Sequence, residues 1–125
     1  MTDEIIPGDL RYFILRYIDS VGQLEALLLL RANPSKDWKA EAIANRLYIS
    51  REEAQELLNR LCANALLACS DDLYRYGDPP EALRTMIDRL VEAYARHLIP
   101  VTSIIHSKPP RIHRFADAFK FRKGQ

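Results

Sequence analysis

Residues 38–77 decide the fold of this chain, and they read WKAEAIANRLYISREEAQELLNRLCANALLACSDDLYRYG. Residues 38–47 have the apolar spacing of a short amphipathic helix. Ser50 then stands where it can cap a second helix, and Glu53 is spaced to reach back to that cap. The second helix keeps its apolar residues on one face, namely Ala54, Leu57, Leu58, Leu61 and Ala65. The segment therefore predicts two helices joined by the tight connection 48–49.

A β-hairpin is predicted directly after the second helix. Residues 66–69 are typical of a strand, residues 70–72 of a turn, and residues 73–76 of the returning strand. Two short helices followed by a hairpin is the order of a winged helix-turn-helix, which places its second helix in a DNA groove when it serves as a regulator. We therefore expect a mainly α fold, with a helical core, a hairpin wing and a long C-terminal helix.

Two further helices are expected before this unit. Apolar residues recur at helical spacing from Asp9 to Ile18. Ser20 and Gln23 have the spacing of a capping box, which starts a helix that Pro34 ends. Three helices should therefore precede the helix that begins at Ser50.

A seven-residue apolar repeat follows the hairpin. Its positions are Leu83, Ile87, Leu90, Tyr94, His97, Val101 and Ile104. Such a repeat is typical of a helix that packs along another helix, so residues 78–107 predict a long dimerisation helix. Its expected dimer interface consists of Leu83, Ile87, Leu90, Tyr94 and Val101. Pro100 should kink or break this helix, and a short strand over Val101–Ile105 is an open alternative because that stretch is β-branched.

The C-terminal segment 108–125 differs from the rest of the chain in charge. It carries six basic residues against one acidic residue, a net charge of +5 in a chain whose total is +1. Three phenylalanines fall within seven residues, at Phe115, Phe119 and Phe121. The candidate partner-binding residues here are Arg111, Arg114, Phe115, Phe119 and Lys120. Packing of this tail on the protein itself or on a dimer mate is an alternative, and a membrane-surface role is less well supported. The expected organisation is thus 1–77, 78–107 and 108–125.

Composition agrees with one ordinary globular domain. The chain has 125 residues, of which 48% are hydrophobic and 28% charged. No stretch approaches the roughly 20 apolar residues that cross a bilayer, and the start has no basic-then-apolar export signal. We therefore expect a cytoplasmic protein.

Cys62 and Cys69 are too few for a disulfide framework. Both are expected to pack as small hydrophobic residues. A redox switch between the second helix and the hairpin is the alternative that their positions leave open.

In outline, residues 20–98 resemble the MarR-type winged-helix transcriptional regulators. The resemblance is one of element order and not of a signature peptide. It implies a dimeric DNA-binding regulator in which the start of the second helix contacts bases. Those positions are Arg51, Glu52, Gln55, Glu56 and Asn59 here, and the wing tip is Ser70, Asp71 and Asp72. We take Arg51, Gln55 and Asn59 as base-contacting candidates, with Lys36 and Lys39 as a positive rim.

The excess of acidic residues in the second helix and hairpin disfavours DNA binding by this face alone. Residues 50–77 carry three basic and five acidic residues, whereas a DNA-docking face should be basic. A basic tail or a dimer would add phosphate contacts. The alternative function is a winged-helix module that binds a protein through the basic, Phe-rich tail.

Sequence motifs give no support to an enzyme. His97, His106 and His113 lack metal-ligand spacing with cysteines or carboxylates, and the four glycines are too scattered for a phosphate-binding loop. We therefore expect no catalytic residues, no metal and no cofactor.

Overall fold

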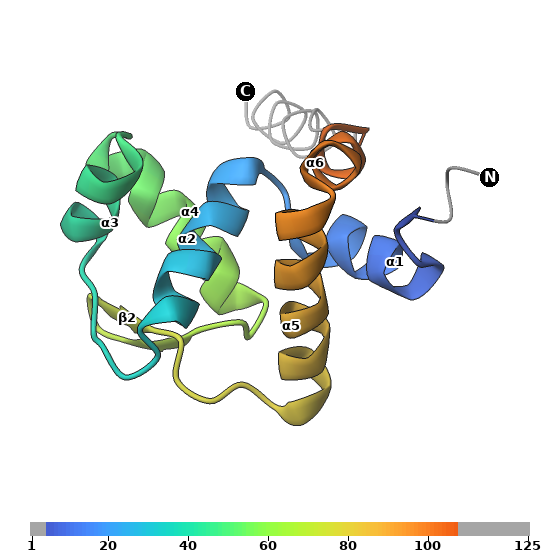
Figure 1. Ribbon diagram of the computed structural model, residues 1–125. Helices are drawn as coiled ribbons and strands as arrows, with labels where there is room; N and C mark the ends of the chain where they lie inside the picture. Colours follow the sequence, from blue (N-terminus) through green and yellow to red (C-terminus); the bar gives the residue numbers. More distant parts are fainter. Residues whose placement is uncertain (1–4, 108–125) are drawn as a thin grey trace, which may run out of the picture.

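In the computed structural model, residues 5–107 are described. They form a mainly helical protein with one two-stranded antiparallel hairpin, as predicted (Figure 1). The helices are α1 (Gly8–Tyr17), α2 (Val21–Ala32), α3 (Ala40–Leu47), α4 (Arg51–Ala63), α5 (Glu81–Arg96) and α6 (Leu98–Ser107). The strands are β1 (Ala68–Ser70) and β2 (Leu73–Arg75).

Side-chain caps begin α2 and α4, at the two serines that the sequence indicated. The backbone N–H of Gln23 donates to Ser20 Oγ at 3.1 Å, and the side-chain oxygen of Gln23 accepts from the backbone N–H of Asp19 at 2.8 Å. Ser50 and Glu53 form the reciprocal capping box, with distances of 3.0 and 3.1 Å. Each cap satisfies backbone donors that have no partner inside the helix, so both helix starts are set by local sequence.

The hairpin is tied to the residue that leads into α3. Ala68, Cys69 and Ser70 pair with Arg75, Tyr74 and Leu73 in turn. On its other side Tyr74 exchanges two backbone hydrogen bonds with Trp38, each of 2.8 Å. Gly77 leaves the hairpin with φ +64°, and a Cβ there would lie 3.0 Å from the Cβ of Ala68. Glycine is therefore required where the chain turns away toward α5.

Helix packing divides the chain into two groups around one continuous core. α2, α3 and α4 pack together beside the hairpin, and α1, α5 and α6 pack together on the other side (Figure 1). An ion pair between Arg31 and Asp88, at 3.0 Å, joins the two groups. A second ion pair, between Arg89 and Asp9 at 2.7 Å, joins α5 to α1 within the second group. Fully buried aliphatic side chains fill the space between the groups, among them Leu24, Leu27, Leu58, Leu61, Ile87 and Leu90.

The expected long helix is divided in two. The break falls at His97, three residues before Pro100, where the backbone leaves helical geometry with φ −133° and ψ 60°. Proline has no N–H to donate to the carbonyl of Arg96, and its ring would clash with that carbonyl in a continuous helix. The break lies one residue after that carbonyl, and Pro100 sits in the first turn of α6, where proline is tolerated. The strand alternative for 101–105 is wrong, because this stretch is helical.

The apolar repeat of residues 83–104 faces the interior of the same chain. Ile87, Leu90 and Val101 have no exposed surface, and Leu83 is half-buried against the core. The hydroxyl of Tyr94 donates to a carboxylate oxygen of Glu25 in α2 at 2.6 Å. The repeat is thus explained by packing between α5, α6 and the rest of the chain. Ile87, Leu90 and Val101 therefore have no exposed surface in this chain, Leu83 and Tyr94 are half-buried, and the dimer interface stays a prediction.

The Tyr94–Glu25 contact predicts a pH dependence of stability. Burial, followed by the hydrogen bond to Glu25, raises the pKa of Tyr94 to about 12, above the value near 10 of an unfolded tyrosine. The folded chain therefore keeps a proton that the unfolded chain has lost, and this contribution to stability is complete below pH 10 and lost between about pH 10 and 12.

As the pH rises from about 10 to 12, the free energy of unfolding of the Tyr94→Phe variant should consequently fall by less than that of wild type. Urea unfolding at steps from pH 9 to 12 measures the difference. Some decline should remain in the variant, because burial also raises the pKa of Tyr76. Parallel curves for the two proteins would contradict the assignment to Tyr94.

Candidate nucleic-acid interface

The exposed face of α4 begins at the capping box. Arg51 and Glu52 are exposed in its first turn, and Gln55 is half-buried one turn further along. The Glu53 carboxylate accepts a hydrogen bond from the Ser50 backbone N–H. At the start of this helix, Arg51, Glu52 and Gln55 therefore have solvent-exposed surface, while Glu53 caps the helix end.

A polar hollow of about 230 Å³ lies where α3, α4 and the hairpin meet. Three of the five residues predicted to contact nucleic acid line it, namely Lys39, Arg51 and Gln55. The other side chains around it are Glu41, Asp72 and Tyr74, with Ala40 between them. Residues from three separate segments thus form one site, with two cations, two carboxylates and an amide available to a polar ligand.

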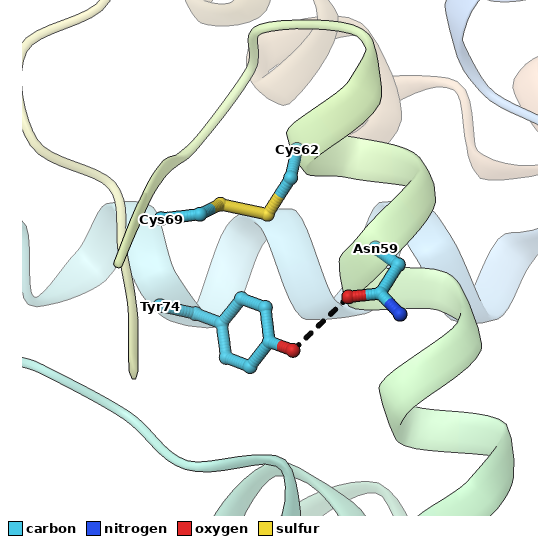
Figure 2. Close-up of a disulfide and its surroundings, with 4 residues drawn as sticks. All are labelled: Asn59, Cys62, Cys69 and Tyr74. Atoms are coloured by element: carbon cyan, nitrogen blue, oxygen red, sulfur yellow. Dashed lines mark hydrogen bonds between the residues drawn. A yellow bond between two sulfur atoms is a disulfide. The ribbon is translucent and has the colours of Figure 1, made fainter. Parts of the chain in front are cut away.

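Asn59 has an internal partner that the sequence did not predict. Its amide oxygen accepts a hydrogen bond of 3.0 Å from the hydroxyl of Tyr74, a buried residue of β2 (Figure 2). The contact joins α4 to the hairpin within the chain. Asn59 therefore helps to position the hairpin, and because it is also exposed, its contact with bases stays a prediction.

Lys36 is also held by an internal contact. Its Nζ lies 4.1 Å from the centre of the Trp38 ring, and Arg46 lies over the same ring at 5.6 Å. Cations attract the electron-rich face of an indole, so both side chains cover Trp38, which is 2% exposed. Both residues are exposed, so their charge remains at this edge of the molecule beside the tryptophan.

Acidic groups offset the basic ones across this face. Arg75 of the hairpin pairs with Asp37 at 3.4 Å. Asp71 and Asp72 are exposed in the turn of the hairpin. The positive charge that the hollow presents to a ligand therefore comes mainly from Lys39 and Arg51.

Cys62 and Cys69 are joined by a disulfide, so the expectation of two unlinked packing residues is wrong. Their Cα atoms are 6.2 Å apart, inside the range that a disulfide spans. The bond connects the last turn of α4 to β1 (Figure 2). The sequence carried a signal for it, because the two cysteines flank the short connection between a predicted helix and a predicted strand.

Other parts of the site prediction fall elsewhere. The candidate partner-binding residues Arg111, Arg114, Phe115, Phe119 and Lys120 lie outside the described residues. Within residues 5–107, no group of three or more His, Cys, Asp or Glu side chains is arranged to hold a metal ion. Over the same range, none of the helices has the length and apolar character needed to cross a membrane.

Comparisons with protein-family models, with curated proteins and with solved structures find no match to this chain.

Sequence reasoning missed Tyr74 and Glu41 as parts of this site. Tyr74 was predicted only as part of the returning strand 73–76, and its hydroxyl acquires a partner only once α4 is folded beside the hairpin. Glu41 belongs to a segment whose exposed residues alternate in charge, and nothing local distinguishes the one that faces the hollow.

The Tyr74–Asn59 bond predicts a measurable coupling between α4 and the hairpin. The Tyr74→Phe variant keeps the ring and loses the hydroxyl, so it should lower the free energy of unfolding by about 1 kcal/mol. Asn59→Ala should cost a similar amount, and the double variant little more than either one, in a double-mutant cycle measured by urea unfolding.

Tyr12→Phe is the matched control for this cycle. Tyr12 is 68% exposed, so its hydroxyl stays in water and the substitution should change stability by less than about 0.5 kcal/mol. Additive costs for Tyr74→Phe and Asn59→Ala would show that their hydrogen bond does not hold the hairpin.

Proposed function

We propose that the protein is a winged-helix DNA-binding transcriptional regulator. The observation that carries this proposal is the double attachment of β2, through its backbone to Trp38 before α3 and through the Tyr74 side chain to Asn59 in α4. These contacts hold a hairpin beside the second of two helices joined by three residues. The order α2, extended Trp38, α3, α4, hairpin matches the order of elements in winged-helix regulators, with α4 as the recognition helix.

The side chains around the hollow divide into two roles. Arg51 and Gln55 project from the first two turns of α4, and their planar groups suit bidentate contacts to guanine and adenine edges. Lys39 lies across the hollow at the start of α3 and contacts phosphate. Asn59 acts indirectly, by fixing the hairpin.

The charge balance shapes the binding that this proposal predicts. Few cations face the DNA, so non-specific affinity from the described face is low and depends on few phosphate contacts. The basic tail and a homodimer add phosphate contacts beyond those of one folded domain. Specific contacts of Arg51 and Gln55 then supply a large share of discrimination.

A second candidate function is favoured by the acidic hairpin turn. Asp71 and Asp72 are exposed there, and Glu52 and Glu56 are exposed on the same helix as Arg51. Carboxylates repel phosphate and suit a basic protein partner. A winged-helix module that binds protein, with its basic and Phe-rich tail as a further docking segment, is therefore the alternative.

Two single substitutions at the hollow should change DNA binding in opposite directions. Lys39→Ala should weaken binding to a random-sequence duplex roughly threefold to tenfold and reduce the salt slope by about 1. Asp72→Asn should strengthen binding, because it removes a charge that repels phosphate. Fluorescence anisotropy of the full chain at several salt concentrations measures both effects.

Arg96→Ala supplies the control, since Arg96 is exposed on α5 and forms only an exposed pair with Glu92. Its loss of one positive charge should leave the salt slope unchanged. No binding by the wild-type chain at low salt would overturn the DNA proposal and leave the protein-binding alternative.

A further inference from the structure

Two cross-links join the same side of α4 to the hairpin. Asn59 and Cys62 are three residues apart, so they lie on one face of the helix. Their partners, Tyr74 and Cys69, are directly opposite each other across the two strands. One cross-link is a hydrogen bond and the other is a disulfide (Figure 2). The two bonds together form a clamp, which we call the α4–hairpin clamp, and only one half of it is sensitive to redox conditions.

The two strands depend on this clamp to different degrees. β2 has the buried Tyr74 ring and the backbone bonds to Trp38 to hold it. All three residues of β1 are exposed, so none of its side chains is anchored in the core. Leu67, just before the strand, is buried in the core, but β1 itself is held only by its pairing with β2 and the bond from Cys69 to Cys62. Loss of the disulfide therefore loosens β1 first.

We infer that the Cys62–Cys69 disulfide is a reversible redox switch that controls how firmly the hairpin is held against α4, and through it the affinity for DNA. This inference deepens the proposed function and rests on it for the DNA step alone. Cys69 is exposed and Cys62 half-buried, so an external thiol has access to one sulfur of the bond. Exposed disulfides are the labile and regulatory ones.

Low-molecular-weight thiols of the glutathione class supply the electrons. A thiolate attacks Cys69 Sγ, the bond to Cys62 breaks, and Cys62 leaves as a thiolate that takes up a proton. A second thiolate attacks the outer sulfur of the mixed disulfide, which releases Cys69 as a thiolate, also protonated, and one molecule of oxidised reagent. Two thiols are oxidised and two cysteines are reduced. The reverse reaction restores the clamp.

The direction of the effect follows from preorganisation. The oxidised chain presents α4 and the hairpin at a fixed mutual position, and a rigid pair of elements loses less conformational freedom on binding. In the reduced chain β1 must be ordered again at the expense of binding free energy. The oxidised form is therefore the tighter DNA-binding form.

The first test examines the switch without DNA. The full chain is equilibrated in glutathione buffers from oxidising to reducing, and free thiols are alkylated and counted by intact mass. The reduced fraction should rise across the series. Both cysteines alkylated in every buffer, or neither in any, would overturn the switch.

Hydrogen exchange then measures directly how firmly the hairpin is held. Reduction should speed exchange of the β1 amides by roughly fivefold or more and leave α5 unchanged. The Cys62→Ser/Cys69→Ser variant should match reduced wild type with or without reductant. Unchanged β1 exchange on reduction would show that the disulfide does not control the hairpin. Thermal unfolding of the variant confirms that it is folded at the temperature used.

Measurements of DNA binding separate this inference from the proposed function. Affinity for one duplex should fall about threefold to tenfold on reduction of wild type and stay constant in the double variant. Equal affinity of the oxidised and reduced chains overturns the control of DNA binding. No binding in either state, together with faster β1 exchange on reduction, overturns the proposed function and keeps the switch on the hairpin.

Discussion

Tyr74 is the residue through which the hairpin acquires a fixed place. A two-stranded hairpin is marginally stable alone in water, and this one has only three paired residues in each strand. Tyr74 meets Trp38 through its backbone, Cys69 across the strands and Asn59 through its hydroxyl. Its ring is also buried in the core. The hollow formed by α3, α4 and the hairpin exists because one residue connects all three.

Local sequence was enough to predict the helices that begin with their own caps. Ser50 and Glu53 satisfy each other within four residues, and Ser20 caps the Gln23 N–H while the Gln23 side chain accepts from the Asp19 N–H. The hairpin was predictable for a similar reason, since its two strands are separated by only two residues. Lys39, Arg51 and Gln55 were named as site residues from their places at helix starts, and the structure brings them to one hollow.

Long-range contacts were beyond the sequence patterns. The repeat through Ile87 and Leu90 shows that a helix packs along another helix, but the same spacing serves a partner in the same chain or in a second copy. Only the fold shows that these residues meet the chain's own core. The internal partner of Asn59 was unpredictable for the same reason. Its hydrogen bond to Tyr74 forms only when another element, here β2, lies beside α4.

The placement of acidic residues has a consequence for how this face would distinguish ligands. Where a binding face is strongly basic, long-range attraction dominates and many polyanions bind alike. Here Asp72 and Glu41 stand beside Lys39 and Arg51 in one small hollow, so a phosphate gains little unless its geometry lets it approach the cations and avoid the carboxylates. Such a mixed site favours selectivity over affinity. A selective site of this kind requires α3, α4 and the hairpin to keep fixed relative positions. The Tyr74 contacts and the Cys62–Cys69 disulfide, which together include both bonds of the α4–hairpin clamp, hold them there.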